Sequence, residues 1–413
     1  MIKKIKRIFF SLGCCILGLF IRRKKDHLAF GSWEGKLYID NSRYLFEYIL
    51  KTYKNVTLIW IGNESVKNKV PHEENVKVYR KNSVRSVFAL LECQYMFCSQ
   101  THEVDLCSYN VYTGAIITYL HHGMPLKKWG ADSAAGHSDF RSTGIKRVFR
   151  KLIAAEIEYQ YFVTSSPYHD KTNLTALDYR GCTEEKNVHS GTPRNDMLIN
   201  YSRDYAQALK KRYAEKIGFD EEKKVILYLP TYRRQGTPTR SFSKGLREEE
   251  DQMLHECLLL HNGVLIEKNH YAEDKRHGDE EYQKEDVIHL NQNVNIQEML
   301  LFTDILISDY SGAFLDFVLL DRPVILYAYD YEEYKNRDSG LYYSIEEFAA
   351  GRIVKDVKGV TDSIALYFAN PTEDQDLRRA VRNKFMSYEK GIASPYICER
   401  VFKDEIETCQ RGM

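Results

Sequence analysis

The chain has 413 residues, of which 43% are hydrophobic, so it is long enough for two domains and apolar enough to fill their cores. Lysine and arginine number 59 against 58 for aspartate and glutamate, which excludes an overall attraction to nucleic acid or another polyanion. The nine cysteines are irregularly spaced and form no Cys-x-x-Cys pair, a pattern typical of a reducing interior rather than of a disulfide framework.

The chain begins with an apolar segment between two basic clusters. Residues 8–21, IFFSLGCCILGLFI, follow MIKKIKR and precede RRKK at 22–25. The segment is shorter than the roughly 20 residues of a membrane-spanning helix, and no small-residue cleavage site of a secretory signal follows it. We therefore predict that residues 1–25 lie in the cytoplasmic interface of an anionic membrane, with their cations on lipid headgroups. The alternative is a first helix buried in the protein.

From residue 27 onward, short apolar runs alternate with stretches of helical spacing, which is the pattern of α/β domains with parallel sheets. The expected strands are 27–32, 56–62, 76–79, 95–99, 115–120 and 159–166, and then 224–232, 263–270, 286–290, 304–311 and 323–330. The prediction is an α/β protein with two Rossmann-like domains facing one cleft. Its expected parts are a membrane-associating segment at 1–25, domains at 26–200 and 201–372, and C-terminal helices at 373–413.

One turn in the second half has the features of a phosphate site. A buried strand is expected to end at Asp309, Ser311 is a good helix cap, and Gly312 allows close approach of a ligand to the backbone. The free N–H groups at the start of the following helix favour a phosphate. The turn is neither G-x-G-x-x-G nor a Walker loop, so nicotinamide binding and P-loop hydrolysis are not indicated. A capped structural turn is the alternative.

Other polar residues follow expected strands in both halves. They are His122 in HHGMPLKKWG, Arg194 in HSGTPRND, Arg233 in LPTYRR, and Lys268 and His270 in IEKNHY. Each alone is more often part of a solvated loop. In parallel α/β sheets, however, such ends gather where ligands bind, so the set is expected to converge on one cleft. Bases and cations facing a helix start suit phosphoryl transfer, where catalysis is mainly positioning and charge stabilisation.

These motifs, together with ISDYSGAFLDF and FGSWEGKLYIDNSRYLFEYI, occur in an order that resembles the CDP-glycerol glycerophosphotransferase family of teichoic acid synthesis. The resemblance covers about residues 29 to 355. It implies a B-type glycosyltransferase (GT-B) fold and a peripheral membrane enzyme on the cytoplasmic face of the bacterial cell membrane. The implied reaction transfers an alditol phosphate, glycerol or ribitol, from a CDP-alditol with release of CMP. The implied acceptor is an undecaprenyl-type lipid-linked saccharide or a growing polymer.

The resemblance also implies roles for single residues. His122, rather than its neighbour His121, matches the base that deprotonates the acceptor hydroxyl, while His121 is expected to be a core or supporting histidine. His270 matches the second functional histidine and is expected on the donor phosphates. The first domain would bind the acceptor and the second the donor. The expected donor and phosphate-binding residues are Arg194, Arg233, Lys268, Asp309, Ser311 and Gly312.

The sequence departs from the family pattern where Met124 replaces a usual threonine and Gly312 a common second serine. These changes leave the identities of donor and acceptor open, including glycerol against ribitol, primase against polymerase, and teichoic acid against capsule. For Asp196, which lies close to Arg194 in the sequence, we predict only that it lines the cleft.

No metal site is indicated, because adjacent His121 and His122 diverge and lack further ligands at suitable spacing. Mg²⁺ remains possible as a companion of the donor diphosphate, and no nucleic acid partner is expected. Two other functions stay open: a GT-B glycosyltransferase that uses a nucleotide sugar, and a non-catalytic protein that binds a nucleotide at a membrane surface.

Overall fold

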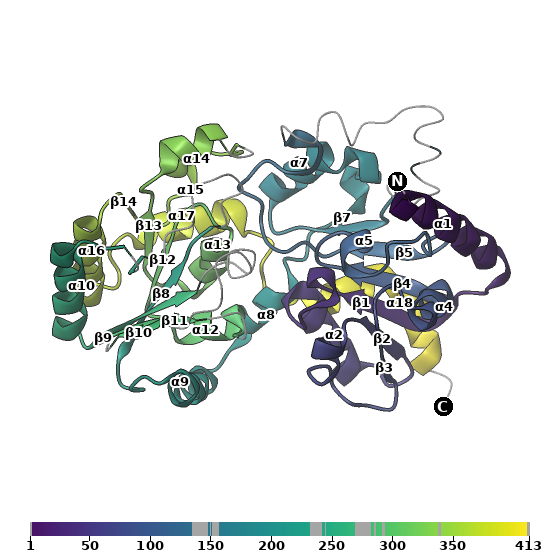
Figure 1. Cartoon of the computed structure of the whole chain (residues 1–413), viewed down its shortest axis with the longest axis horizontal. Coiled ribbons are helices and arrows are strands. Elements are labelled where there is room, and N and C mark those ends of the chain that lie inside the picture. The colour runs from purple at the N-terminus through teal and green to yellow at the C-terminus, as the bar shows by residue number, and fades with distance from the viewer. Residues whose placement is uncertain are drawn as a thin grey trace. The chain divides into compact units, whose positions relative to one another are not determined.

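The computed structural model describes residues 2–133, 148, 150, 157–231, 242–243, 245–268, 282–284, 286–290, 294–337 and 340–410 (Figure 1). The chain divides into two compact units. Unit 1 comprises Met1–His122, Trp129–Asp196 and Tyr388–Met413, and unit 2 comprises Gly123–Lys128 and Met197–Ser387. The main division therefore falls directly after Asp196. The short stretch after His122 belongs to unit 2, and the C-terminal stretch returns to unit 1.

Unit 1 contains a seven-stranded parallel sheet with the order β3-β2-β1-β4-β5-β6-β7. Its strands are β1 (Lys24–Gly31), β2 (Thr57–Ile61), β3 (Val76–Tyr79), β4 (Cys93–Cys98), β5 (Ile116–Tyr119), β6 (Tyr161–Val163) and β7 (Asn187–Val188). The first six overlap the predicted strands. β7 was not predicted, since two residues give no periodic signal.

Helices cover both faces of this sheet. They are α1 (Ile2–Phe20), α2 (Asp40–Thr52), α3 (Glu64–Lys67), α4 (Val84–Glu92), α5 (His102–Asp105), α7 (Pro167–Ala176) and α18 (Ala393–Gln410), whereas α8 (Pro193–Asn200) spans the division between the units. Successive side chains of a strand point to opposite faces. Ala29 of β1 packs in one core cluster with residues of α1 and α4, whereas Leu28 and Phe30 pack in another with residues of α2 and α18.

Unit 2 contains a second seven-stranded sheet with the order β10-β11-β9-β8-β12-β13-β14. Its strands are β8 (Lys224–Leu229), β9 (Gly263–Lys268), β10 (Tyr282–Lys284), β11 (Val287–Leu290), β12 (Ile305–Ser308), β13 (Val324–Tyr327) and β14 (Arg352–Val354). All pairings are parallel except that of β10 with β11. The prediction of two parallel α/β sheets is thus confirmed, apart from this antiparallel edge. The edge strands β10 and β14 were not predicted.

The helices of unit 2 are α9 (Arg203–Ile217), α10 (Glu248–Leu260), α12 (Ile296–Phe302), α13 (Ala313–Phe317), α14 (Tyr331–Arg337), α15 (Ile345–Phe348), α16 (Val357–Ala369) and α17 (Gln375–Phe385). The tail predicted to be helical thus forms α17 in unit 2 and α18 in unit 1. Among the described residues, no helix combines the length and the apolar character needed to cross a membrane.

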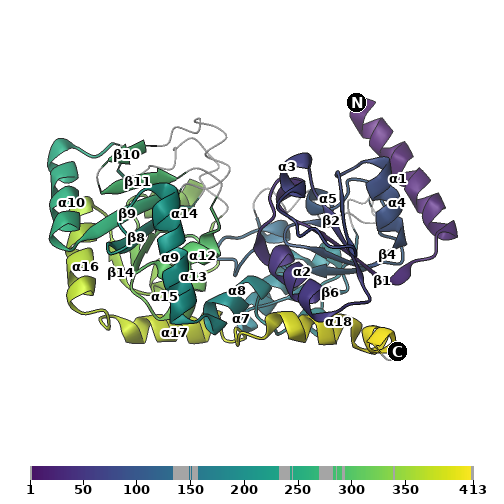
Figure 2. The same ribbon diagram turned by 90° about the horizontal axis from the view of Figure 1, so that it is seen from below.

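The first helix, α1, is docked on unit 1 by one face only. Ser11 and Cys14 are buried, and Gly18 lies against Leu91 of α4. In both views α1 runs alongside α4 (Figure 1, Figure 2). The outward face carries exposed large apolar side chains, which are Phe9, Phe10, Ile16, Leu17, Leu19 and Phe20. The helix therefore combines features of both alternatives, an inner face that is buried and an outer apolar face that is open.

Candidate active site

The predicted base lies in a turn at the carboxyl end of β5 in unit 1. After Leu120 the chain turns at His121, whose φ of +59° falls in the left-handed region that residues other than glycine rarely adopt. The His121 side chain is buried, with its ring centroid 4.3 Å from that of His169. The His122 side chain is exposed. The turn thus sends His121 into the core, as expected, and leaves His122 open to a ligand.

A buried asparagine holds this turn. Asn41, in the first turn of α2, donates from Nδ2 to the carbonyl oxygens of Leu120 and His121 at 3.1 and 2.8 Å. Its Oδ1 accepts from the backbone N–H of Arg194 at 3.1 Å. One side-chain amide therefore fixes both the turn before His122 and the start of α8, which carries Arg194.

An ion pair stands beside the same turn. Arg194 Nη1 donates to Asp40 Oδ1 at 2.9 Å, and Trp33 Nε1 donates to Asp40 Oδ2 at 3.1 Å. Both charged side chains are mostly buried, with 12% and 4% exposed. Trp33, Glu34 and Asp40 have φ values of +48°, +60° and +68°. Such conformations cost on the order of 1 kcal/mol each and cluster at functional sites.

The surroundings of the three histidines near this turn lower their pKa values. The protein atoms around the ring lower the pKa of His122 below its usual 6.5, although the side chain reaches solvent. The Arg194 charge lowers this pKa further, while Asp40 and a backbone hydrogen bond with Ser99 raise it. Burial lowers the pKa of His169 to about 3 and that of His121 well below its usual value. A neutral imidazole with solvent access is what a general base at neutral pH requires.

The loop after β4 completes the surroundings of His122. Ser99 Oγ accepts from the backbone N–H of Ser42 at 3.1 Å and shares a hydrogen bond with Ser42 Oγ at 2.9 Å. The fully buried carboxyl of Asp105 accepts from the N–H groups of Ser99 and Gln100 at 3.0 and 2.7 Å. Burial raises the pKa of Asp105 to about 8. This loop is therefore fixed to the start of α2, where Asp40 and Asn41 also lie.

The C-terminal stretch braces the segment that carries Arg194. The Asp196 carboxylate accepts from the N–H groups of Ala393 and Ser394, at 2.7 and 2.8 Å, where α18 begins. The buried Glu389 carboxylate accepts from the N–H of Thr192 at 3.0 Å and from its hydroxyl at 3.2 Å. Asp196 therefore serves as a cap for α18.

In unit 2, two predicted residues, Lys268 and Asp309, lie with Thr231 at the carboxyl ends of three neighbouring strands. Lys268 is the buried last residue of β9, Thr231 follows β8, and Asp309 follows β12. The two Asp309 oxygens accept from the Thr231 N–H at 2.9 and 3.0 Å, and Oδ1 also accepts from the Thr231 hydroxyl. Asp309 therefore joins the ends of β8 and β12.

The turn expected to bind phosphate lies directly beyond Asp309. Ser311 Oγ accepts from the N–H of Ala313 at 3.2 Å, where α13 begins. A Cβ atom on Gly312 would lie 3.0 Å from the carbonyl oxygen of Met124, so a glycine suits this position better than the serine common in the family. The stretch that contains Met124 is further held in unit 2, because Lys128 N–H donates to Gly340 and Leu126 accepts from Tyr342 N–H.

Two predicted residues, Arg233 and His270, lie outside the described residues. Within the part of the chain that is described, no group of three or more His, Cys, Asp or Glu side chains is arranged to hold a metal ion. The structure adds Trp33, Asp40, Asn41 and Ser99 to the surroundings of His122. Asp40 and Asn41 open α2, and at the start of a helix such residues usually act as caps, so the sequence does not indicate that they also hold the His122 turn.

The chain thus consists of two α/β units with mostly parallel, Rossmann-like sheets, and its candidate groups lie at strand ends. This is also the fold of the wall teichoic acid polymerase TagF. One solved structure of that protein superimposes with a TM-score of 0.76 over all of both chains at 24% identity, and another with 0.73 over 99% of both at 22%.

The family model described as "CDP-Glycerol:Poly(glycerophosphate) glycerophosphotransferase" matches residues 16–403, so the chain belongs to this family. The chain is 28% identical to the teichoic acid poly(glycerol phosphate) polymerase of Bacillus spizizenii, over 95% of both chains. It is also 28% identical to the teichoic acid glycerol-phosphate transferase of Staphylococcus aureus, over 92% of this chain and 93% of the relative. It spans about half of the longer Bacillus subtilis polymerase, 52% of its length at 26% identity.

Proposed function

We propose that this protein transfers glycerol phosphate from CDP-glycerol to a membrane-linked acceptor in teichoic acid synthesis. The match of residues 16–403 to one transferase family carries the proposal. Glycerol is preferred over ribitol because the glycerol-phosphate enzymes above align with 92% and 95% of this chain. Two ribitol-phosphate enzymes, a Staphylococcus aureus polymerase and the Bacillus spizizenii primase, align with only 54% and 61% of this chain.

The proposed reaction is one in-line displacement. The acceptor hydroxyl loses its proton to His122 and attacks the β-phosphorus of the donor. The bond from that phosphorus to the bridging oxygen breaks, and CMP leaves with the electron pair. The new phosphodiester joins glycerol phosphate to the acceptor. Because phosphoryl transfer depends mainly on positioning and on stabilisation of negative charge, the remaining residues act in these two ways.

We assign positioning roles to Asp40, Asn41 and Arg194, which hold the turn before His122 by the hydrogen bonds described above. On the donor side, we propose that Lys268, Arg233, His270 and the backbone at Ser311–Gly312 bind the phosphates of CDP-glycerol. Asp309, a carboxylate that already accepts several hydrogen bonds, acts by shaping this turn rather than by touching phosphate.

We also propose that the two units face one cleft that holds donor and acceptor, as in a GT-B enzyme. The covalent path of the chain supports this. Met124 follows His122 by only two residues, a span of about 7 Å at most. The Met124 carbonyl lies against Gly312 within unit 2, so the stretch that begins directly after His122 is part of the unit assigned to the donor.

We further propose peripheral attachment to the cytoplasmic face of the cell membrane through the outward face of α1. Replacing Phe9, Leu19 and Phe20 by serine removes only exposed apolar side chains, so the protein stays folded and sedimentation with anionic vesicles falls at least about tenfold. Cys14→Ala on the inner face is the matched control and retains binding. Undiminished sedimentation of the triple variant would contradict the attachment.

The reaction is tested by nucleotide release from the purified protein supplied with a lipid-linked saccharide acceptor. The donors are CDP-glycerol, CDP-ribitol, UDP-glucose and UDP-N-acetylglucosamine. We expect acceptor-dependent CMP from CDP-glycerol. CMP from CDP-ribitol alone would keep the reaction and change the donor, whereas UDP release would make the protein a sugar-transferring GT-B enzyme.

A further inference from the structure

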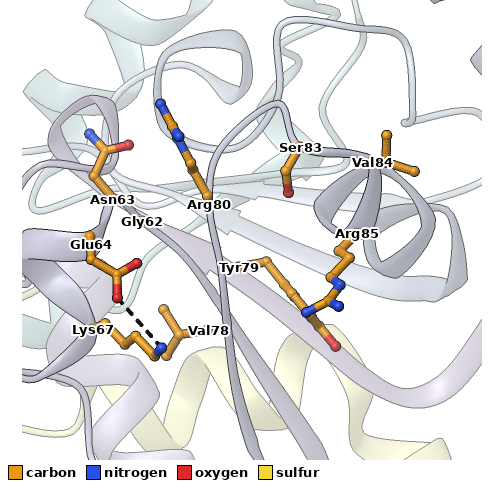
Figure 3. A pocket seen from close by; sticks show the side chains of 10 residues that line it. All are labelled: Gly62, Asn63, Glu64, Lys67, Val78, Tyr79, Arg80, Ser83, Val84 and Arg85. Carbon is orange, nitrogen blue, oxygen red and sulfur yellow. Dashed lines mark hydrogen bonds and ion pairs between the residues drawn. The ribbon is translucent and has the colours of Figure 1, made fainter.

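Unit 1 has a hollow of about 420 Å³ at the carboxyl ends of β2 and β3 (Figure 3). In the sheet, β1 and β4 separate these two strands from β5, after which the His122 turn lies. None of the predicted site residues lines the hollow. The lining residues are Gly62, Asn63, Glu64, Lys67, Val78, Tyr79, Arg80, Ser83, Val84 and Arg85. They come from the end of β2, from α3, from the end of β3 and from the start of α4. Ligands of parallel α/β sheets bind at such strand ends.

The charges in the hollow favour a phosphate. Lys67, Arg80 and Arg85 are opposed only by Glu64, which pairs with Lys67 at 3.5 Å, so the lining carries three positive charges and one negative charge. Within the described part of the chain, neither the Arg80 nor the Arg85 guanidinium has a hydrogen bond or an ion pair. Figure 3 shows these two side chains coming from different segments of the rim. The net charge of +2 in this lining matches the roughly two negative charges of a terminal phosphate.

An exposed apolar surface adjoins the hollow. Val84 lines it and is 72% exposed, and one turn further along α4 Phe88 is 47% exposed. Alongside α4 runs α1, whose outward face carries the exposed apolar side chains named above (Figure 2). Helix α4 thus contributes the cation Arg85 to the hollow, and it also carries the exposed apolar side chains of Val84 and Phe88. A free anion would need only the cations, whereas a lipid needs both features side by side.

We propose that this hollow binds the phosphate or diphosphate headgroup of a membrane lipid, whose chains lie against the apolar surface of α1 and α4. The inference rests on the membrane attachment proposed for α1. That attachment needs only apolar contact with the bilayer, and the inference adds a specific binding site for a lipid headgroup. The site holds a lipid beside the first unit and is separate from the groups assigned to catalysis.

The experiment measures how much more tightly the full-length protein binds to phosphatidylcholine vesicles that contain phosphatidate than to vesicles that contain oleate at the same measured surface potential. We expect the wild type to prefer phosphatidate by about tenfold or more. The double variant Arg80→Gln/Arg85→Gln should lose this preference and still bind both vesicles through α1. The matched control, Lys51→Gln/Lys54→Gln, removes two exposed charges at the end of α2, on the other face of the sheet, and should keep it.

Each outcome decides a separate point. A preference that survives in the Arg80→Gln/Arg85→Gln variant would overturn the headgroup site. Inorganic phosphate should reduce the preference more than chloride of equal ionic strength does, because it competes for the same cations, and a preference that both salts reduce equally would also overturn the proposal. Equal wild-type binding to both vesicles would refute the headgroup site alone. If the wild type bound neither kind of vesicle, the attachment through α1 would be contradicted as well. The experiment therefore distinguishes failure of the headgroup site from failure of the membrane attachment.

Discussion

Replacing Asn41 by alanine should destabilise unit 1 and slow the reaction together. The change removes the donors to the buried carbonyl oxygens of Leu120 and His121. A buried polar group without a partner costs about 1–3 kcal/mol, with carbonyls towards the lower end, so we expect a loss of about 2–4 kcal/mol. The turn before His122 also loses its clamp, and a displacement of about 1 Å in a catalytic group can reduce turnover about 100-fold.

Tryptophan fluorescence during urea denaturation measures the first effect selectively, because Trp33, Trp60 and Trp129 all belong to unit 1. CMP release at saturating donor measures the second. Asn75→Ala is the matched control, since among the described residues the Asn75 side chain makes one hydrogen bond, from Nδ2 to the carbonyl of Val56 at 2.9 Å. It should cost about 1 kcal/mol and leave turnover intact. An Asn41→Ala protein with wild-type stability and turnover would refute the reasoning.

Two further predictions concern protons. Because the Asp40 charge raises the pKa of His122 and the Arg194 charge lowers it, Asp40→Asn should move the acidic limb of the kcat/KM profile to lower pH and Arg194→Gln to higher pH. Shifts in the same direction would show that these charges do not tune the base. The buried Asp105, whose pKa is raised to about 8, binds a proton in the folded state that the unfolded chain has lost, so its contribution to stability falls as pH rises from about 4 to 8. Asp105→Asn should flatten the decline of the urea midpoint over this range, and an unchanged slope would show that this carboxyl is not the cause.

The sequence was a good guide to the strands because both sheets are covered on both faces, so that their central strands are continuous apolar runs. The strands that escaped prediction are short and lie at sheet edges. β14 has two exposed residues out of three, and β7 consists of Asn187 and Val188 only. Neither an apolar run nor an alternation is present for a pattern to detect.

The positions of the candidate residues were predictable where they directly follow strands. Contacts between residues that are distant in the sequence were not predictable. His122 follows an apolar run, but only the φ of His121 decides which of two adjacent histidines faces solvent. Asp40 and Arg194 are 154 residues apart, and nothing in either segment indicates the other. Asp309 was placed at the correct strand end, yet its hydrogen bonds to Thr231 show a use that a strand-end position cannot specify.

The most direct test of the account compares His122→Ala with the wild type in two measurements, CMP release at saturating CDP-glycerol and equilibrium binding of CDP-glycerol. Loss of a positioned base should reduce turnover roughly 10²- to 10⁴-fold, while donor affinity, assigned to unit 2, stays within about twofold. A variant that retains nearly full turnover with bound donor would contradict His122 as the base and the mechanism built on it.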